Sequence, residues 1–356
     1  MSIEFSFMQQ GYPVFSGENA LSLLEELLNV PNDFSKMLVL CDDNTFEHCL
    51  PSLKKHLPSS IPFDFFKMKS GESSKSLSVC ESIWQKLTDM KMGRNDLLIN
   101  LGGGVVCDVG GFVAATYLRG ISFLNIPTSV MGMVDAGLGG KNGIDLHHHK
   151  NRIGSFAFPI ATVCDPVFLN TLPDVEWKNG CAEVFKHALI GDAKLFEMLS
   201  VDGCTRANFN SLLHSIQGVK LKVVEDDPFE DGFRKVLNFG HTVGHAIESA
   251  SLKKDSTPLS HGEAVAMGMI IENEIMFQLG GLNAYSNSKC REVLEKHLTK
   301  VKITSYSEDE LLEWMKFDKK NANSIIRMSL ITSIGSCSWN VEVPQDIIRT
   351  ALQSFR

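Results

Sequence analysis

Long apolar runs are absent from this 356-residue sequence, in which no uninterrupted apolar segment reaches the roughly 18 residues of a membrane-spanning helix. The N-terminus, Met1–Phe5, lacks the basic region and apolar stretch of a secretory leader. Basic residues are in deficit, since 34 Lys and Arg stand against 42 Asp and Glu, a net charge of −8. We therefore expect neither a membrane protein nor a nucleic-acid binder, but a cytoplasmic protein that holds any anionic substrate with a few local cations.

The nine cysteines lack the C-x-x-C spacing of a cysteine zinc site, are odd in number and are scattered along the chain. This pattern argues against a disulfide framework and predicts reduced thiols. The remaining composition, with 44% apolar and 21% charged residues, is that of a folded globular protein. Since a domain usually spans about 100–200 residues, the length predicts two domains.

The first part of the chain alternates short apolar runs with segments of helical period, which predicts a parallel sheet in an α/β domain over residues 1–170. Polar or glycine-rich turns follow the apolar runs. Because the carboxyl ends of parallel strands meet at one edge of a sheet, we expect a nucleotide to bind there. The predicted strands are Met37–Cys41, Phe63–Phe66 and Asp96–Asn100, and the predicted helices are Thr45–His56 and Lys75–Met90.

The pattern changes to mostly helical segments after about residue 175. Asp165-Pro166 and Leu172-Pro173-Asp174 punctuate the junction. We therefore place the boundary near residue 170 and assign residues 171–356 to an α-helical domain. Its predicted helices are Cys181–Ile190, Ala193–Ser200, Phe209–Val224, His241–Ser249 and Gly262–Gln278.

Two glycine-rich segments could bring the backbone close to a ligand. Gly102-Gly103-Gly104 follows a predicted strand, so it could bind a cofactor phosphate at a helix N-terminus or form only a tight turn. The spacing is not G-x-G-x-x-G, and the two interpretations stand about even. The second segment, Asp135–Gly143, sets one carboxylate and one ammonium among four glycines, with Lys150-Asn151 just beyond it.

Three histidines within Arg234–Glu248 and Leu259–Glu263 form the strongest local signal. His241 and His245 share a helix face at i, i+4, so spacing alone nominates them as a metal-binding pair. Glu183 is the best candidate for a carboxylate ligand, with Lys186 at i+3 as a charge partner. The alternative is capping or core histidines beside an ordinary helical Glu–Lys pair.

Together these segments resemble the sugar phosphate cyclase family, and within it the 3-dehydroquinate synthases, from about Asp42 to about Ile334. Several motifs of the family occur in this sequence in the same order and with the same spacing. Cys107 and His149 depart from the family pattern, because the family usually has glycine at these two positions. The motifs are Gly102–Asp108, Ala115–Gly120, Ile126–Thr128, Asp135–Gly143, Lys150–Gly154, Ala182–Val184, Leu237–His241, His261–Val265 and Asp318–Lys320.

The resemblance implies a Rossmann-like NAD-binding domain followed by an α-helical domain that binds metal and substrate. It implies that a zinc or cobalt ion is held by Glu183, His241 and His261, in place of the pair nominated by spacing. It also implies a homodimer in which Arg119 reaches the site of the neighbouring subunit. Substrate-binding or catalytic roles are implied for Asp135, Lys141, Asn151, Lys186, Lys220, Arg234, Asn238, His245 and one of Lys319 and Lys320. NAD contacts are implied for Asp42, Asn44, Glu72, Lys75, Gly103, Gly104, Val105, Asp108, Thr128, Ser129, Asp135, Lys141, Lys150, Phe168, Thr171 and Leu172.

The implied activity converts 3-deoxy-D-arabino-heptulosonate 7-phosphate to 3-dehydroquinate and phosphate in the shikimate pathway, by NAD-dependent oxidation, phosphate elimination, reduction and ring closure. Another sugar phosphate cyclase is one alternative, against which Asn238, His245 and Asp318–Lys320 argue. A second alternative is a metal-dependent polyol dehydrogenase. Its substrate would give no role to the cluster of lysines and Arg234. A third alternative is a non-catalytic NAD-binding scaffold. Such a scaffold should have lost at least one of the metal-binding residues, and this sequence has lost none of them.

Overall fold

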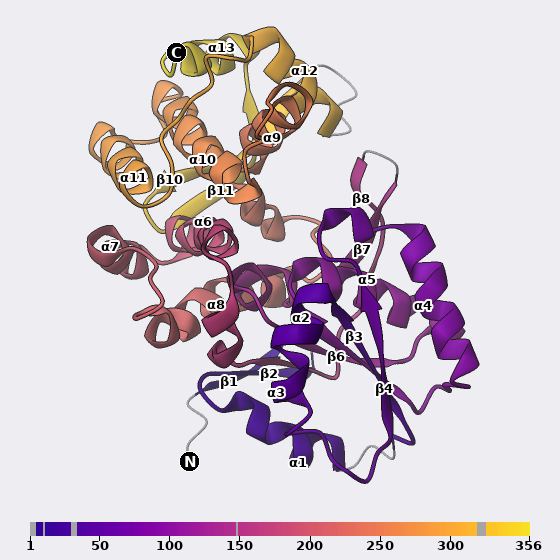
Figure 1. The fold of residues 1–356 in the computed structure, drawn as a ribbon. Coiled ribbons are helices and arrows are strands. Elements are labelled where there is room, and N and C mark those ends of the chain that lie inside the picture. The colour runs from indigo at the N-terminus through magenta and orange to yellow at the C-terminus, as the bar shows by residue number, and fades with distance from the viewer. Residues whose placement is uncertain (1–4, 10, 30–33, 147–148, 319–324) are drawn as a thin grey trace. The chain divides into compact units, whose positions relative to one another are not determined.

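The structure is a computed structural model that describes residues 5–9, 11–29, 34–146, 149–318 and 325–356 (Figure 1). The chain divides into two compact units, Met1–Trp177 and Lys178–Arg356. The division falls inside helix α6 (Asp174–Gly191), a few residues beyond the expected boundary. Within the described ranges, no helix combines the length and apolar character that crossing a membrane requires.

A seven-stranded sheet forms the centre of the first unit, in the order β1-β2-β9-β6-β5-β3-β4. Neighbouring strands are parallel except for β1 and β2, so the predicted parallel-sheet fold class is confirmed. Its strands are β1 (Phe5–Gln9), β2 (Tyr12–Ser16), β3 (Met37–Asp42), β4 (Phe63–Met68), β5 (Leu97–Gly102), β6 (Ser122–Pro127) and β9 (Ala161–Cys164). The α-helices of this unit are α1 (Leu24–Asn29), α2 (Asp43–His48), α3 (Leu50–Leu53), α4 (Leu77–Asp89) and α5 (Gly104–Thr116).

The central strands β3 and β5 are buried on both faces, which explains their almost continuously apolar sequences. Leu38, Leu40 and Leu98 belong to the core beneath α4 and α5, which cover one face of the sheet (Figure 1). Because these strands are parallel, the turns that follow Asp42 and Gly102 lie at the same edge. The polar and glycine-rich turns predicted to meet there do so.

One local prediction for this unit needs correction. The helix predicted over Thr45–His56 is interrupted, because Pro51 in the first turn of α3 has no N–H with which to continue α2. The glycine-rich segment Asp135–Gly143 begins at the end of a π-helix (Gly132–Ala136), continues through a turn at residues 137–140 and ends in a hairpin of β7 (Lys141–Leu146) and β8 (His149–Phe156).

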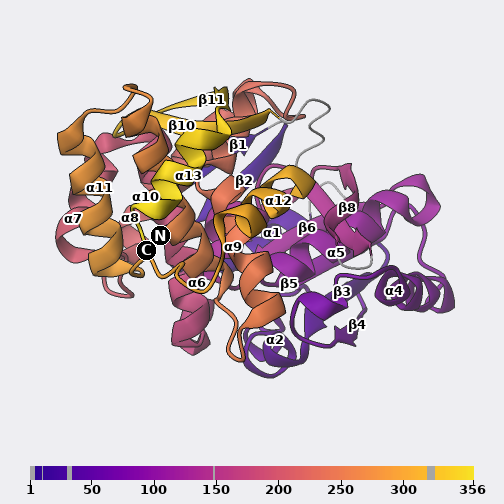
Figure 2. The ribbon, with the colours of Figure 1, turned by 90° about the horizontal axis from the view of Figure 1, so that it is seen from above.

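The second unit is mostly helical, as predicted, and includes one hairpin that periodicity did not predict. Helix α10 packs against α9, α11, α13 and β10, and Figure 2 shows it among these elements. The helices, after α6, are α7 (Ala193–Asp202), α8 (Phe209–Asp226), α9 (His241–Lys254), α10 (His261–Gln278), α11 (Ala284–His297), α12 (Glu308–Asp318) and α13 (Gln345–Gln353). The hairpin pairs β10 (Ile326–Ser333) with β11 (Ser336–Val343).

All nine cysteines are free thiols, and seven of them are buried. Burial raises the pKa of Cys41, Cys49, Cys80 and Cys290 to about 12. At neutral pH these side chains are therefore uncharged and behave as small apolar groups in the two cores.

Glycine at position 110 is required by packing. A Cβ there would lie 1.8 Å from Oδ1 of Asn100, whose Nδ2 donates to Oδ1 of Asn125 at 2.9 Å in the buried sheet. We expect Gly110→Ala to lower the free energy of unfolding by about 1–3 kcal/mol, measured by urea denaturation. Gly93→Ala is the control, because its Cβ would meet only Oδ2 of Asp96 at 3.9 Å. Equal stability of the two variants would contradict this packing argument.

Candidate functional site

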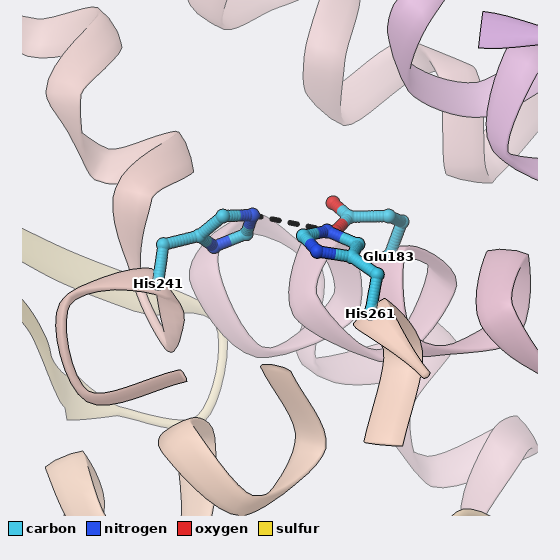
Figure 3. A group of neighbouring side chains, drawn as sticks. All are labelled: Glu183, His241 and His261. Atoms are coloured by element: carbon cyan, nitrogen blue, oxygen red, sulfur yellow. Dashed lines mark ion pairs between the residues drawn. The ribbon is translucent and has the colours of Figure 1, made fainter. Parts of the chain in front are cut away.

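Three side chains from separate helices of the second unit converge on one point (Figure 3). Glu183 lies in the middle of α6, His241 is the first residue of α9, and His261 is the first residue of α10. Glu183 is almost completely buried, whereas the two imidazoles are partly exposed. The arrangement joins positions that are far apart in the sequence.

The spacing of the ligand atoms suits a divalent transition metal. Nε2 of His241 lies 3.5 Å and Nε2 of His261 lies 3.9 Å from Oε1 of Glu183. Ligands of a tetrahedral zinc ion, each about 2.0–2.1 Å from the metal, lie roughly 3.3–3.5 Å from one another. Two imidazoles and one carboxylate are also the donor set of catalytic sites that keep a position open for substrate. These residues therefore fit a metal ion.

A neighbouring oxygen atom close to Nδ1 orients each of the two imidazole rings. Nδ1 of His241 lies 3.0 Å from the carbonyl oxygen of Phe239, and Nδ1 of His261 lies 3.3 Å from Oε2 of Glu248. An acceptor at Nδ1 favours the tautomer that leaves Nε2 with a free lone pair. In both rings that nitrogen faces Glu183.

Burial and a neighbouring cation keep His241 neutral. Burial and the Lys186 ammonium lower the pKa of His241 to about 4, although Glu183 opposes the shift. Lys186 forms an ion pair with Oε2 of Glu183, so the buried carboxylate has a cation on one oxygen and the imidazoles beside the other. A neutral imidazole is the form that binds metal.

His245 lies one turn after His241, and the three histidine rings form one cluster. The ring centroids of His245 lie 5.2 Å from His241 and 5.9 Å from His261. A second possible metal group contains His245, Glu248 and His261. Among the described residues of this unit, neither group combines His241 with His245, so spacing alone selected a pair that the structure does not bring together as ligands.

The cations predicted to bind substrate in this unit are strongly buried. Lys186 in α6, Lys220 in α8 and Arg234 in the 3₁₀-helix Phe233–Asn238 are each no more than 5% exposed. Cations are rarely buried without an anion to bind. Arg234 is also held by its backbone, whose N–H donates to Oδ2 of Asp227 at 2.9 Å.

Three acidic residues of this unit that the sequence patterns did not nominate form hydrogen bonds with predicted site residues or their loops. Glu230, with φ of 63°, has Oε1 at 3.5 Å from Nδ2 of Asn238. Glu248 follows His245 at i+3 on the same helix, so helical spacing could have found it. Asp227 accepts hydrogen bonds from three backbone N–H groups, those of Asp231, Gly232 and Arg234. No periodic pattern in the sequence predicts this role. Lys319 and Lys320 lie outside the described residues.

The predicted nucleotide residues of the first unit lie around the carboxyl edge of its sheet. Gly103 is the N-cap residue of α5 and, as a glycine, has no side chain with which to cap the helix. A Cβ on Gly102 would lie 2.4 Å from Cγ2 of Val106, so this glycine serves the tight turn. For Gly103, Gly104 and Val105 the phosphate-binding interpretation remains a prediction, and their place at the N-terminus of α5 is consistent with it.

Lys75, which is buried, and Asp108, which is partly buried, form an ion pair at this edge, with Nζ and Oδ2 2.7 Å apart. Burial raises the pKa of Asp108 despite its lysine partner. Burial alone would lower the pKa of Lys75, but the carboxylates of Asp108 and Glu72 outweigh it and raise the pKa. Both residues were predicted to contact NAD, and the pair fixes them against each other.

Other predicted residues sit on unusual backbone. Asp135 lies in the π-helix Gly132–Ala136, a rare conformation that is frequently found at functional sites. Asn151 has φ of 54°, and its N–H donates to Oδ1 of Asp145 at 2.8 Å. Lys141 begins β7, and Lys150 precedes Asn151 in β8.

Arg119 lies in a strained turn after α5. Leu118 and Arg119 have φ of 51° and 66°, in the left-handed region that glycine normally occupies. Nη2 of Arg94 donates to the carbonyl oxygen of Leu118 at 3.0 Å and holds the turn. Strain of this kind is concentrated at functional sites, which supports the prediction of a role for Arg119.

The remaining predicted NAD contacts have local structural roles as well. Asp42 caps α2 by accepting the Thr45 N–H at 2.8 Å. Ser129 accepts the Gly132 N–H at 3.1 Å and so helps to begin the π-helix. Asn44 lies in α2, Thr128 directly follows β6, and Phe168, Thr171 and Leu172 lie in or just after the 3₁₀-helix Pro166–Thr171.

Comparison with known proteins identifies relatives for almost the whole chain. Family models described as 3-dehydroquinate synthase N-terminal and C-terminal match residues 65–179 and 180–321. A 3-dehydroquinate synthase of Parabacteroides distasonis is 37% identical over 326 residues, which are 91% of this chain and 92% of that protein.

Solved structures with the same fold include two cyclases. A 2-deoxy-scyllo-inosose synthase complexed with carbaglucose-6-phosphate, NAD⁺ and Co²⁺ has a TM-score of 0.86 at 22% identity and covers 97% of each chain. The 2-epi-5-epi-valiolone synthase of Streptomyces hygroscopicus, with NAD⁺ and Zn²⁺ bound, has a TM-score of 0.85 at 25% identity and covers 99% of this chain and 98% of its own.

The converging triad makes a prediction about metal affinity. His261→Ala removes one of three ligands, and we expect the affinity for Zn²⁺ to fall by roughly 100-fold or more, measured by competition with a chromophoric chelator. His214→Ala, on α8, is the control and should leave the affinity unchanged. Wild-type affinity in His261→Ala would exclude this residue as a ligand.

Proposed function

Because the chain belongs to the 3-dehydroquinate synthase family, we propose that Glu183, His241 and His261 hold its metal ion and that buried cations of the same unit bind its phosphate-bearing substrate. The convergence of these three side chains from three helices is the observation that carries the proposal. The distances between their ligand atoms and the orientation of both imidazoles support it.

The chain is an NAD- and metal-dependent enzyme with 3-dehydroquinate synthase activity. It converts 3-deoxy-D-arabino-heptulosonate 7-phosphate to 3-dehydroquinate and inorganic phosphate. Glu183, His241 and His261 would hold the metal ion, which would supply polarisation of a substrate hydroxyl, and NAD⁺ would supply a hydride acceptor that is regenerated within each turnover, so no net NADH should accumulate.

The protein's own groups prepare this chemistry by placing charge where it is needed. Lys186 offsets the charge of Glu183, and His241 stays neutral through burial. Lys220 and Arg234, both strongly buried, supply cations for the phosphate and carboxylate of the substrate. Since these cations are shielded from water, their attraction for an anion is stronger than that of surface lysines.

The proposal also assigns the remaining residues by their family roles. Asn238 and His245 contact the substrate close to the metal ligands. In the first unit, Arg119, Asp135, Lys141 and Asn151 contact the substrate. NAD is bound by the residues at the carboxyl edge of the sheet, including Lys75, Gly103, Gly104 and Asp108.

Three finer properties belong to the same proposal. Zinc is the metal, with cobalt able to replace it, because one carboxylate and two imidazoles accept either ion. The enzyme is a homodimer in which Arg119 acts on the partner's site. It works in the cytoplasm, where nine free thiols remain reduced.

Another sugar phosphate cyclase remains the alternative, since two such enzymes share the fold. The sequence relatives and the presence of Asn238 and His245 favour 3-dehydroquinate synthase. The polyol dehydrogenase alternative gives no role to the buried cations Lys220 and Arg234, which a substrate with a phosphate and a carboxylate would use.

Phosphate release is the direct test of the activity. We expect release from 3-deoxy-D-arabino-heptulosonate 7-phosphate with NAD⁺ in catalytic amount, loss of release on adding a metal chelator, recovery on adding Zn²⁺, and no accumulation of NADH. Glucose 6-phosphate serves as the control substrate. Release from the control alone would favour another cyclase, and stoichiometric NADH from a simple polyol would favour a dehydrogenase.

Mixed dimers test whether Arg119 acts on the partner's site. Arg119→Ala alone should lower kcat by roughly 100-fold without weakening NAD or metal binding, because a charged contact to phosphate is lost. When Arg119→Ala is co-expressed with His241→Ala under a second tag, each mixed dimer purified through both tags keeps one complete site. Its activity should reach about half of the wild-type value.

A role for Arg119 within its own subunit predicts the opposite result. Each site of the mixed dimer would then lack either Arg119 or His241, and the activity would stay at the level of the single variants. Arg291→Ala, which removes an exposed ion pair with Glu295, is the matched control and should leave kcat unchanged.

A further inference from the structure

Helices α9 and α10 approach each other through glycine. A Cβ on Gly268 of α10 would lie 2.0 Å from the carbonyl oxygen of Gly240 and 2.6 Å from the nitrogen of Gly244. A Cβ on Gly244 would in turn lie 3.0 Å from the carbonyl oxygen of Ala264. The beginning of α9 therefore rests directly on the backbone of α10, with no side chain between them.

A buried carboxylate joins the same two helices. Glu272 of α10 is completely buried, and its Oε2 accepts the Gly240 N–H at 2.6 Å while its Oε1 accepts the Val243 N–H at 3.0 Å. Gly240 is the N-cap residue of α9 and has φ of 79°. As a glycine it has no side chain with which to cap its own helix.

The two bonded N–H groups are those that a capping box satisfies. In a capping box, the N-cap side chain accepts the N–H of the third helical residue, and the side chain of that residue accepts the N–H of the N-cap. Helix α10 begins with such a pair, Ser260 and Glu263. At α9 both N–H groups are bonded instead by Glu272, from the neighbouring helix.

His241 lies between these two anchored positions. It is the first residue of α9, directly after Gly240 and two residues before Val243. His261 begins α10, and Glu272 lies three turns further along the same helix. The separation of the two imidazoles, 5.7 Å between ring centroids, therefore depends on how Glu272 fixes the start of α9 against α10.

We propose that Glu272 is a positioning residue of the metal centre, which sets the place of His241 relative to His261 by capping α9 from α10. The inference rests on the proposed function in one respect, that the triad binds metal. A merely structural cap would contribute to stability and leave the metal's environment unchanged.

Cobalt is the probe, because its visible absorption spectrum reports the geometry of its ligands. Glu272→Gln places an amide where two N–H groups need acceptors, so one of the two bonds is lost. We expect Co²⁺ affinity to fall roughly 10–100-fold and the visible spectrum of the bound ion to change. Glu272→Asp keeps the carboxylate, should retain more of the affinity than the amide variant, and serves as the test if Glu272→Gln fails to fold.

Glu274→Gln is the matched control on the same helix. Glu274 accepts side-chain bonds from Gln278 at 3.0 Å and Asn287 at 2.8 Å, away from α9. The Glu274→Gln variant should keep the wild-type Co²⁺ affinity and visible spectrum. The affinity for NAD⁺ should be unchanged in all the variants.

A Glu272 variant that unfolds at lower urea yet binds Co²⁺ with wild-type affinity and spectrum would overturn the inference. Failure of the wild-type protein to bind Co²⁺ would instead contradict the proposed metal centre.

Discussion

The Glu183 carboxylate is the group on which the arrangement of the second unit depends. A buried carboxylate is unfavourable unless cations or hydrogen-bond donors surround it. Lys186 neutralises one oxygen from the same helix, and the imidazoles of His241 and His261 stand beside the other. Helices α6, α9 and α10 must therefore pack together at this carboxylate. The residues that fix their packing need not contact a ligand.

The supporting residues show how such precision is obtained. Small residues let α9 and α10 approach backbone to backbone, and the carboxylate of Glu272 replaces a capping side chain that Gly240 does not have. Glu248 orients His261, and the carbonyl group of Phe239 orients His241. Functional groups are held most accurately by elements whose own positions are fixed by packing and hydrogen bonds.

Local patterns predicted the parallel sheet and most long helices, because apolar periodicity reflects which faces are buried. They failed where the cause is a single residue, as at Pro51, and they also missed the β10–β11 hairpin, although its two strands are neighbours in the sequence. Helical spacing nominated His241 and His245 as a metal-binding pair, and only the family resemblance assigned His261, which lies on another helix, as a ligand. Glu272 could not be predicted, because it bonds backbone groups that have no sequence signature.

The buried cysteines can report local unfolding of each unit, because a buried thiol reacts only when the core around it opens. Burial keeps Cys80 of the first unit and Cys290 of the second protonated and out of contact with water. An alkylating reagent can therefore modify each only when the surrounding core opens, at a rate set by the free energy of that opening. The order in which mass spectrometry finds these cysteines labelled then reveals which unit opens first, without any introduced label.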